Sequence, residues 1–528
     1  MRALAALFQS RPRPNGGPPE PCKASGDTPP WGRIGPALGA IAAGSLCVLA
    51  VLFLVRSRPF VGGVDFLDYA LYSRDLASNV PDVPRARYVF FPGVYVFWSS
   101  VIRWFGVDLA PLQRAHIGVL AVDAALIVAI AHAITRKVGL SLIAAPGYVF
   151  VAWRLEGLAG TTEPLGTIPF LGGLYCWVLA RRADRPLLAN ALLGFGLGLT
   201  LFMKQQGGLL WLGILGLLAE RRGGRGARSR MLSLPMLSLV ACGTFLASMA
   251  IEGGGIAALR AGIEKAVSYP ARGSPLENLL QALDRCGPFG PLLGLGAGLW
   301  VVMLCRRNGD AKTECFASTL GVTVFSAIGA LLQYWTRPYL HYALYALPSL
   351  VMTGVLAVYR IQLALQDWAS SRILRHSLGA LIASLLVLAS GEVLADAVVI
   401  SGWPSGSTFQ AMLERRYAPL CRYVRAGEDV LLIPSRQNGF HWVCRTRAIR
   451  RRWGYGFNLD NNRVENVLHT LEQTPYRSVV VVDANLSWFE RTVFSHGDWR
   501  PVTLLLSRRG FRAVAHTDAA TLYQRPTS

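Results

Sequence analysis

The stretch Leu112–Ile134, which reads LQRAHIGVLAVDAALIVAIAHAI, decides the fold class of this chain. It is longer than the roughly 20 mainly apolar residues that a helix needs to cross the hydrocarbon core of a bilayer. Its only acidic residue, Asp123, stands near its middle. The stretch therefore predicts a membrane-spanning helix rather than a helix of a soluble domain.

Comparable apolar stretches recur along the chain, and together they predict a polytopic α-helical membrane protein with about 11 transmembrane helices. The third and the sixth stretch are short, and each is also a candidate for a re-entrant segment. The candidate spans are Ile34–Val55, Leu112–Ile134, Leu140–Trp153, Pro164–Ala180, Leu187–Met203, Gly207–Ala219, Leu232–Ile251, Phe289–Cys305, Cys315–Trp335, Tyr342–Tyr359 and Leu378–Ile400.

The composition agrees with a membrane protein. Of the 528 residues, 52% are hydrophobic and only 16% are charged, whereas a soluble protein has about 25% charged residues. A multi-domain soluble enzyme is therefore excluded. The net charge of +22 would suit a nucleic-acid partner, but the basic residues form short clusters between the apolar runs. Such clusters are typical of orientation signals in membrane proteins and do not form a phosphate-binding surface.

Three regions follow from this pattern. Residues 1–33 are rich in proline and are expected to form a disordered cytoplasmic arm. Residues 34–400 are expected to form the transmembrane domain, with a long first outside loop at residues 56–111. The positive-inside rule places the N-terminus inside, and an odd number of spans then places residues 401–528 outside.

The C-terminal region is predicted to be a small α/β domain. Strand-like runs occur at Val430–Ile433, Ser478–Val482 and Val502–Leu506, with segments compatible with helices between them. Nine cysteines in so long a chain do not form a disulfide framework. Cys421 and Cys444 both lie in this outside region, where a disulfide is chemically allowed, and the sequence leaves their pairing open.

The first outside loop carries two neighbouring carboxylates, Asp65 and Asp68. A helix starting at about Asp65 would place both of them and Tyr69 on one face. Such a pair suits a general base with a metal ligand or hydrogen-bonding partner. The alternative is a pair of acids that only stabilise the start of a helix. Further along, residues 88–106 are rich in aromatic residues and predict a helix lying in the membrane interface, with a short span as the alternative.

Several short segments occur in an order that resembles one superfamily of membrane enzymes. They are Tyr69–Leu76 (YALYSRDL) after Asp65, Tyr88 with Pro92 and an aromatic stretch closing in Phe105-Gly106, Thr161–Pro164 (TTEP), Leu201–Lys204 (LFMK), and Arg337–Tyr342 (RPYLHY) with Leu347-Pro348. In this order they resemble the GT-C superfamily of integral-membrane glycosyltransferases. The most similar families are the lipopolysaccharide core glycosyltransferases, the protein O-mannosyltransferases and the aminoarabinose transferases. The predicted topology brings the last three segments to the same side of the membrane as Asp65.

The resemblance implies an inverting glycosyltransferase that moves a sugar from a polyprenyl-phosphate carrier to an acceptor on the outer face of the membrane. The acceptor would be a glycolipid, a polysaccharide or a protein. The expected partners are the polyprenyl-phosphate-linked sugar donor, the lipid bilayer and this acceptor, with no nucleic acid. The resemblance and the composition together point to a bacterial inner membrane.

This chemistry needs a base for the acceptor hydroxyl and positive charge for the leaving phosphate. Asp65 matches the catalytic aspartate of the family and is the candidate base. Asp68 and Glu163 are candidates for binding the acceptor or a divalent cation. Many members have Asp-Glu where this chain has Asp65-Phe66, so a metal site is left open. The candidates for binding the donor phosphate are Lys204, Arg337, His341 and Tyr342.

An ion- or proton-coupled transporter is the alternative function. Acidic residues inside a membrane are functional candidates by default, and Asp123, Glu392 and Asp396 fall within predicted spans. Transporters of this kind often show matching halves with broken helices, and no such repeat is visible in this sequence. A non-catalytic assembly or sensor protein is a third alternative, which would not require polar residues to converge on one side.

Overall fold

The structure is a computed structural model. It describes residues 39, 42, 64–78, 91–155, 161–219, 226–251, 260, 274–305, 311–336, 340–368, 406–433, 438–447, 477–482 and 500–526. The predicted N-terminal arm lies outside these ranges. So do the candidate spans Ile34–Val55 and Leu378–Ile400, apart from Gly39 and Ala42.

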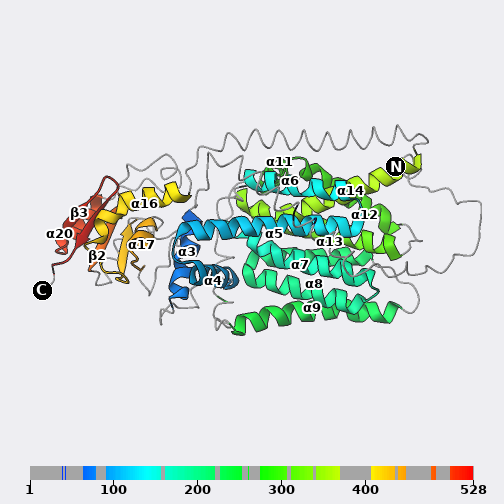
Figure 1. Cartoon of the computed structure of the whole chain (residues 1–528), viewed down its shortest axis with the longest axis horizontal. Coiled ribbons are helices and arrows are strands. Elements are labelled where there is room, and N and C mark those ends of the chain that lie inside the picture. The colour runs from blue at the N-terminus through cyan, green and yellow to red at the C-terminus, as the bar shows by residue number, and fades with distance from the viewer. Residues whose placement is uncertain are drawn as a thin grey trace, which may run out of the picture.

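Long helices lie side by side along the longest axis of the molecule and form one bundle (Figure 1). Among the described residues, five of them are long and apolar enough to cross a membrane, or six if the bent pair α11 (Pro275–Arg285) and α12 (Phe289–Cys305), with an angle of 102°, forms one span. This confirms a helical membrane protein, while the number of eleven spans stays a prediction. The bundle elements are α5 (Leu109–Thr135), α6 (Val138–Arg154), α7 (Glu163–Arg182), α8 (Pro186–Met203), the 3-10 helix η2 (Gln205–Ala219), α9 (Gly226–Ile251), α11 (Pro275–Arg285), α12 (Phe289–Cys305), α13 (Ala311–Thr336), the 3-10 helix η3 (Leu340–Tyr345) and α14 (Leu347–Trp368).

Glycines allow neighbouring helices of the bundle to approach closely. A Cβ atom at Gly194 or Gly198 of α8 would overlap the main-chain oxygens of Leu237 and Ala241 on α9. Small residues at helix contacts are typical of membrane bundles, where close backbone packing stabilises association. The outer face of α9 carries exposed apolar side chains, including Leu239 at 73%. An apolar surface of this kind suits contact with lipid rather than water.

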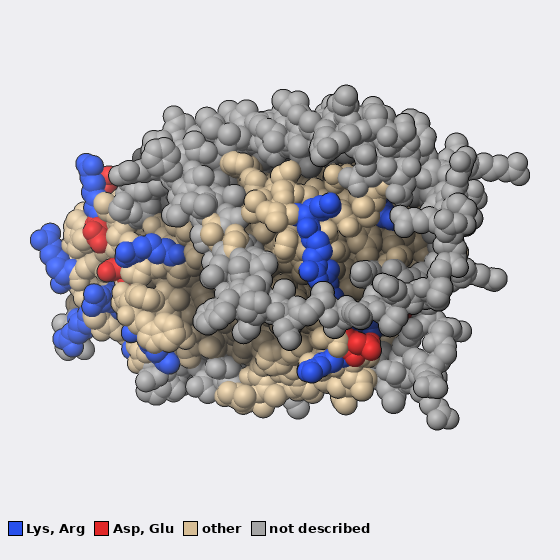
Figure 2. Space-filling view, turned by 45° about the vertical axis from the view of Figure 1, so that its right-hand side comes forward, with Lys and Arg blue, Asp and Glu red and all other residues tan. Residues whose placement is uncertain are grey.

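Charged side chains are unevenly distributed over the face that Figure 2 draws. One group of Lys, Arg, Asp and Glu side chains lies over the end formed by the C-terminal elements, a second group lies over the bundle, and the described surface between the two groups is uncharged. Charged side chains are costly in the hydrocarbon core of a bilayer, so this uncharged surface agrees with a membrane protein.

Two shorter helices, α3 (Val64–Ala77) and α4 (Gly93–Phe105), pack together at one end of the bundle (Figure 1). The aromatic stretch is thus a helix of 13 residues. Its Tyr95 and Trp98 are buried, whereas Trp104 is 78% exposed. The start of α4 lies against the end of α8, where a Cβ at Gly93 would come within 2.8 Å of the Met203 Cα. Its location in a membrane interface stays a prediction.

Beyond α3 and α4 lie the C-terminal elements, which include a four-stranded sheet (Figure 1). The strand order is β1-β2-β4-β3, with β1 parallel to β2 and the other neighbours antiparallel. The domain limits of residues 401–528 stay a prediction. The elements are α16 (Gly406–Cys421), β1 (Val430–Ile433), α17 (Gly439–Val443), β2 (Ser478–Val482), α20 (Arg500–Arg508), β3 (Arg512–His516) and β4 (Ala520–Gln524).

The sequence predicts the first two strands at the observed positions, but the strand predicted at Val502–Leu506 is wrong. This segment lies in the helix α20, which buries Val502 and Leu506. Residues four apart lie on the same face of a helix, so this spacing buries both side chains on the sheet side. Two strands that the sequence analysis did not predict, β3 and β4, follow at once and complete the sheet.

Candidate active site

The candidate site is built at the end of the bundle where α7 begins and α8 ends. These two helices are consecutive and antiparallel, so the N-terminus of α7 and the C-terminus of α8 meet at the same end. Glu163 is the first residue of α7, and Lys204 directly follows α8. Their side chains form an ion pair with 2.6 Å between Lys204 Nζ and Glu163 Oε1. Lys204 Nζ also donates a hydrogen bond of 2.8 Å to Thr162 Oγ1.

The ion pair is almost completely buried, with 2% of the Lys204 side chain and 1% of the Glu163 side chain exposed. Removing two charges from water is costly, and each therefore needs its partner to remain charged. The helix ends add to this effect, because an acid is favoured at the N-terminus of a helix and a base at the C-terminus. The ion pair thus holds the Lys204 ammonium and the Glu163 carboxylate in place inside the protein.

Aromatic rings surround the ammonium group of Lys204. Its Nζ lies 5.8 Å from the ring centroid of Tyr69 on α3 and 5.9 Å from that of Tyr342 in η3. Cations at this distance from an aromatic face are attracted to it. The Thr162 Oγ1 also lies 3.4 Å from the Tyr69 hydroxyl. Residues of α3, of the start of α7 and of η3 therefore converge on the lysine that directly follows α8.

The two carboxylates of the first loop lie on α3. Asp68 is buried, with 1% of its surface exposed. Asp65 lies one helical turn before Tyr69, so these two positions share a face of α3. Because Tyr69 contacts the Lys204 ammonium, the helix that carries Asp65 is directly attached to the site.

The segment after α13 supplies the remaining candidates. The His341 and Tyr342 rings pack edge to face, with 4.8 Å between their centroids. Tyr342 also faces the Lys204 ammonium, which forms the ion pair with Glu163. Arg337 lies outside the described residues. Tyr345 fixes η3 to α7, because a Cβ at Gly166 would overlap its hydroxyl.

The structure brings most of the predicted residues together but pairs them differently. The resemblance assigns Glu163 to an acceptor or a cation and Lys204 to a phosphate, and in the structure the two side chains bind each other. Tyr69 and Thr162, which also contact the lysine, are not among the residues predicted from the sequence to do so. A signal existed, because Tyr69 shares the predicted helix face of Asp65 and Thr162 stands in the TTEP segment. Within the described residues, no group of three or more His, Cys, Asp or Glu side chains is arranged to hold a metal ion.

A second buried polar cluster lies inside the bundle around Asp123 of α5. Its Oδ2 accepts hydrogen bonds from the Tyr148 hydroxyl of α6, at 2.8 Å, and from the Thr167 hydroxyl of α7, at 2.9 Å. Asp123, on which the transporter alternative partly rested, thus joins three neighbouring helices. The other two acids of that alternative, Glu392 and Asp396, lie outside the described residues.

Comparisons with known proteins support the fold. No protein-family model matches the chain, and no curated protein sequence matches it significantly. Among solved structures, it is similar to ArnT from Cupriavidus metallidurans bound to undecaprenyl phosphate, with a TM-score of 0.59 at 14% identity over 92% of this chain and 98% of that chain. The apo state of ArnT gives a TM-score of 0.56 at 13% identity, over 90% and 97% of the two chains.

The Archaeoglobus fulgidus oligosaccharyltransferase in its apo form is also similar. Its TM-score is 0.52 at 13% identity, over 85% of this chain and 70% of that chain. At such low identities the likeness concerns the fold. ArnT and the oligosaccharyltransferase are both GT-C glycosyltransferases. The chain therefore shares its overall fold with these two proteins, in agreement with the resemblance of its short sequence segments to the GT-C superfamily.

Proposed function

We propose that this chain with the GT-C fold is an inverting glycosyltransferase, which moves a sugar from a polyprenyl-phosphate carrier to an acceptor on the outer face of the membrane. The observation that carries this proposal is the buried Lys204–Glu163 pair beneath Tyr69 and Tyr342, next to the helix that contains Asp65. A cation held at the end of a membrane bundle suits a substrate whose phosphate lies at the membrane surface. The ArnT structure of the same fold is bound to undecaprenyl phosphate, a carrier of this class.

The departing phosphate defines the role of the basic residues. Breaking the bond between the sugar and the carrier leaves negative charge on a phosphate oxygen, and positive groups fixed in a dry site stabilise that charge strongly. We assign this role to Lys204, together with Arg337, and to His341 and Tyr342 as hydrogen-bond donors. The bond of Glu163 to the ammonium then keeps Lys204 in place before the carrier binds.

The acceptor hydroxyl needs a base, and we assign that role to Asp65. The base takes the proton from the acceptor hydroxyl. At the same time the hydroxyl oxygen attacks the anomeric carbon from the side opposite the phosphate. One displacement without a covalent enzyme intermediate inverts the configuration of the sugar. Asp68, one position before Tyr69 and buried, is our candidate for orienting the acceptor.

The decisive experiment measures sugar transfer by the purified protein in nanodiscs. The protein would receive a panel of polyprenyl-phosphate hexoses and pentoses with envelope acceptors, and wild type would be compared with Asp65→Asn. We expect transfer with inversion in wild type and a loss of about 10²–10⁴-fold in the variant, the usual contribution of a general base. Asp108→Asn is the matched control, because Asp108 is an exposed carboxylate directly before α5.

Three outcomes would each contradict one part of the proposal. Undiminished transfer by Asp65→Asn would move the base elsewhere, with Asp68 as the next residue to replace. No transfer from any carrier in the panel, with folded protein, would refute the glycosyltransferase itself. An anomeric proton coupling that shows retention would refute the single displacement.

A further inference from the structure

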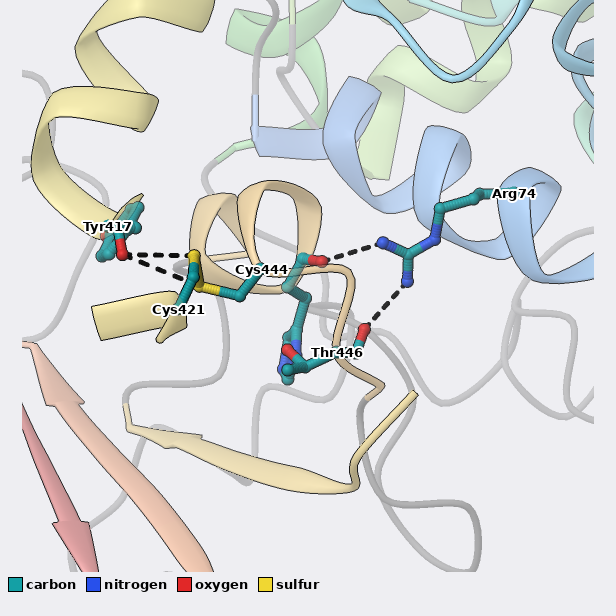
Figure 3. Close-up of a disulfide and its surroundings, with 6 residues drawn as sticks. Arg74, Tyr417, Cys421, Cys444 and Thr446 are labelled. Carbon is teal, nitrogen blue, oxygen red and sulfur yellow. Dashed lines mark hydrogen bonds between the residues drawn. A yellow bond between two sulfur atoms is a disulfide. The ribbon is translucent and has the colours of Figure 1, made fainter. Parts of the chain in front are cut away.

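The helix α3 has a second polar contact, at its other end, with the C-terminal region. Arg74 is buried, and its guanidinium donates hydrogen bonds to two main-chain oxygens, those of His441 at 2.8 Å and of Thr446 at 2.9 Å. Figure 3 shows the side chain reaching from α3 to α17 and to Thr446 in the loop that follows it. The Asp75 carboxylate accepts two further hydrogen bonds from the same guanidinium, at 3.1 and 3.2 Å.

The loop that receives Arg74 is itself held in place. Cys444 forms a disulfide with Cys421, the last residue of α16 (Figure 3). Both sulfurs lie close to the main-chain oxygen of Tyr417, Cys421 Sγ at 3.3 Å and Cys444 Sγ at 3.7 Å. These are contacts rather than hydrogen bonds, because disulfide sulfurs carry no proton.

The backbone of the same loop is bonded to the segment before β1. The Gly427 N–H donates to the Arg445 oxygen at 2.9 Å, and the Val430 N–H donates to the Arg447 oxygen at 3.0 Å. The loop is therefore fixed on one side by a covalent bond and on the other by the sheet. The two oxygens that bind Arg74 have little freedom to follow α3 if it moves.

Apolar packing joins the same parts. One hydrophobic cluster contains Phe66 and Tyr69 of α3, Trp98 of α4, and Tyr417 and Phe440 of the C-terminal region. The helix α3 is thus enclosed between the lysine site, which Tyr69 contacts, and the C-terminal loop, which Arg74 contacts. Because a short helix moves nearly as a rigid rod, the position of Arg74 determines where the Asp65 end of α3 lies.

We propose that Arg74 is a positioning residue, which anchors α3 to residues 438–447 and so holds Asp65 at the lysine site. The Cys421–Cys444 disulfide joins this segment, which contains α17, to the end of α16. The catalytic consequence of the anchor rests on the proposed glycosyltransferase function. A planar guanidinium can donate to two carbonyls and a carboxylate at once, whereas an ammonium has no such fork. Arg74→Lys therefore keeps the charge beside Asp75 but loses the bridge to the two oxygens.

The first test compares hydrogen exchange of wild type and Arg74→Lys in nanodiscs. We expect exchange in residues 438–447 and in α3 to rise about tenfold in the variant, while exchange in α7 and α8 stays unchanged. Arg103→Lys is the matched control, because Arg103 also donates to α3, at the Leu76 oxygen, but is exposed. Unchanged exchange in Arg74→Lys would overturn the anchoring role.

The second test separates positioning from general stability through the kinetics of transfer. A displaced base lowers kcat, and a shift of about 1 Å can cost about 10²-fold. The groups assigned to the carrier phosphate, Lys204, His341 and Tyr342, lie on other elements, and α3 reaches the lysine through Tyr69, so we expect the KM for the carrier to change by much less than kcat. An increase in this KM with an unchanged kcat would contradict the proposal.

The third test uses the disulfide. The other cysteines among the described residues are already free thiols, so a mild reductant changes only the Cys421–Cys444 bond within that part of the chain. We expect reduction of wild type to raise exchange in residues 438–447 and to lower kcat. In Arg74→Lys, reduction should lower kcat by less than about twofold, because the anchor is already lost. If reduction lowered kcat by the same factor in Arg74→Lys as in wild type, the two effects would be independent. Arg74 and the disulfide would then not act through the same segment.

These readouts distinguish this inference from the proposed function. If wild type transfers no sugar from any carrier, the glycosyltransferase proposal fails, and hydrogen exchange alone decides whether Arg74 anchors α3. If wild type transfers sugar but Arg74→Lys matches it in both kcat and exchange, the glycosyltransferase stands and the anchor fails.

Discussion

Lys204, which contacts α3 through Tyr69, and Arg74, which lies on α3, are both buried cations, yet their partners are of different kinds. Lys204 binds the side-chain oxygens of Glu163 and Thr162, whereas Arg74 binds two main-chain oxygens as well as Asp75. Side chains can rotate to release a cation to a ligand. Main-chain oxygens in a cross-linked loop cannot. The comparison agrees with the two proposed roles, a binding site beside Tyr69 and an anchor at the Arg74 end of α3.

The largest effect should come from removing the cation of the site. We expect Lys204→Met to lower transfer by about 10²–10³-fold, comparable to the loss of one donor from a preorganised anion site. The variant also leaves Glu163 buried without its partner, which costs about 3–5 kcal/mol of stability. The double variant Lys204→Met with Glu163→Gln should recover this stability without recovering transfer. Recovery of both would show that Lys204 is only a structural residue.

Acid should weaken the anchor through His441, whose ring lies next to Arg74. Burial and the positive charge of Arg74 lower the pKa of His441 from 6.5 to about 3. Between these two values the unfolded chain binds a proton that the folded chain does not, so stability falls as the pH falls from about 6.5 towards 3. The nearby Asp75, which binds Arg74, is the other titratable group at this contact.

The measurement is exchange in residues 438–447 as a function of pH, corrected for the intrinsic pH dependence of exchange. His441→Gln should flatten the corrected profile between pH 6.5 and the acid limit of the fold. The Nδ1 of His441 contacts Thr446 Oγ1 at 3.0 Å, so His441→Gln also tests whether the loop keeps its shape. A variant profile identical to that of wild type would show that His441 does not control the anchor.

A smaller effect is expected from the aromatic wall of the site. Tyr342→Leu removes the ring 5.9 Å from Lys204 Nζ, and a cation–π contact contributes about 0.5–2 kcal/mol. We expect transfer to fall by roughly 2- to 30-fold, whereas Tyr342→Phe should retain the part due to the ring. The comparison of the two variants divides the effect between the ring and the hydroxyl. Equal losses in both would assign the role to the hydroxyl alone.

The smallest effect on transfer should come from Asp123. The Asp123→Asn variant loses part of a hydrogen-bonded contact to Tyr148 and Thr167, which contributes about 1–3 kcal/mol to stability. We expect a lower thermal midpoint in detergent and transfer within about threefold of wild type. A folded Asp123→Asn protein without transfer would give this cluster a catalytic role. Proton-dependent solute uptake that requires Asp123 would instead support the transporter alternative.

The sequence predicted features that depend on local pattern. Apolar length located α5 and α8, and runs of branched residues located β1 and β2. The segment at 502–506 was misjudged because a short apolar run fits both a strand and one face of a helix. The two strands that follow, β3 and β4, were not predicted. They complete the sheet together with β1 and β2, so residues 502–506 are not needed as a strand and α20 packs on the sheet instead.

Contacts between distant segments were harder to predict. Glu163 and Lys204 could have been paired from the sequence, because α7 and α8 have nearly equal lengths and a short connection, which brings their outer ends together. No such rule links Arg74 to Thr446, which is 372 residues away. Which loop faces α3 depends on how the C-terminal region docks, and sequence spacing carries no information on that.

The distance along the chain between Arg74 and its acceptors also determines the order in which the protein can be completed. Synthesis proceeds from the N-terminus, so α3 and the whole bundle are made before His441 and Thr446 exist. A chain that ends near residue 400 would contain every residue proposed for the site and yet lack both oxygens that hold Arg74. On the proposed anchoring, the Arg74 end of α3 is fixed only after the ribosome has made the C-terminal region, and in an unfinished chain α3 rests on its contacts with α4 and Lys204.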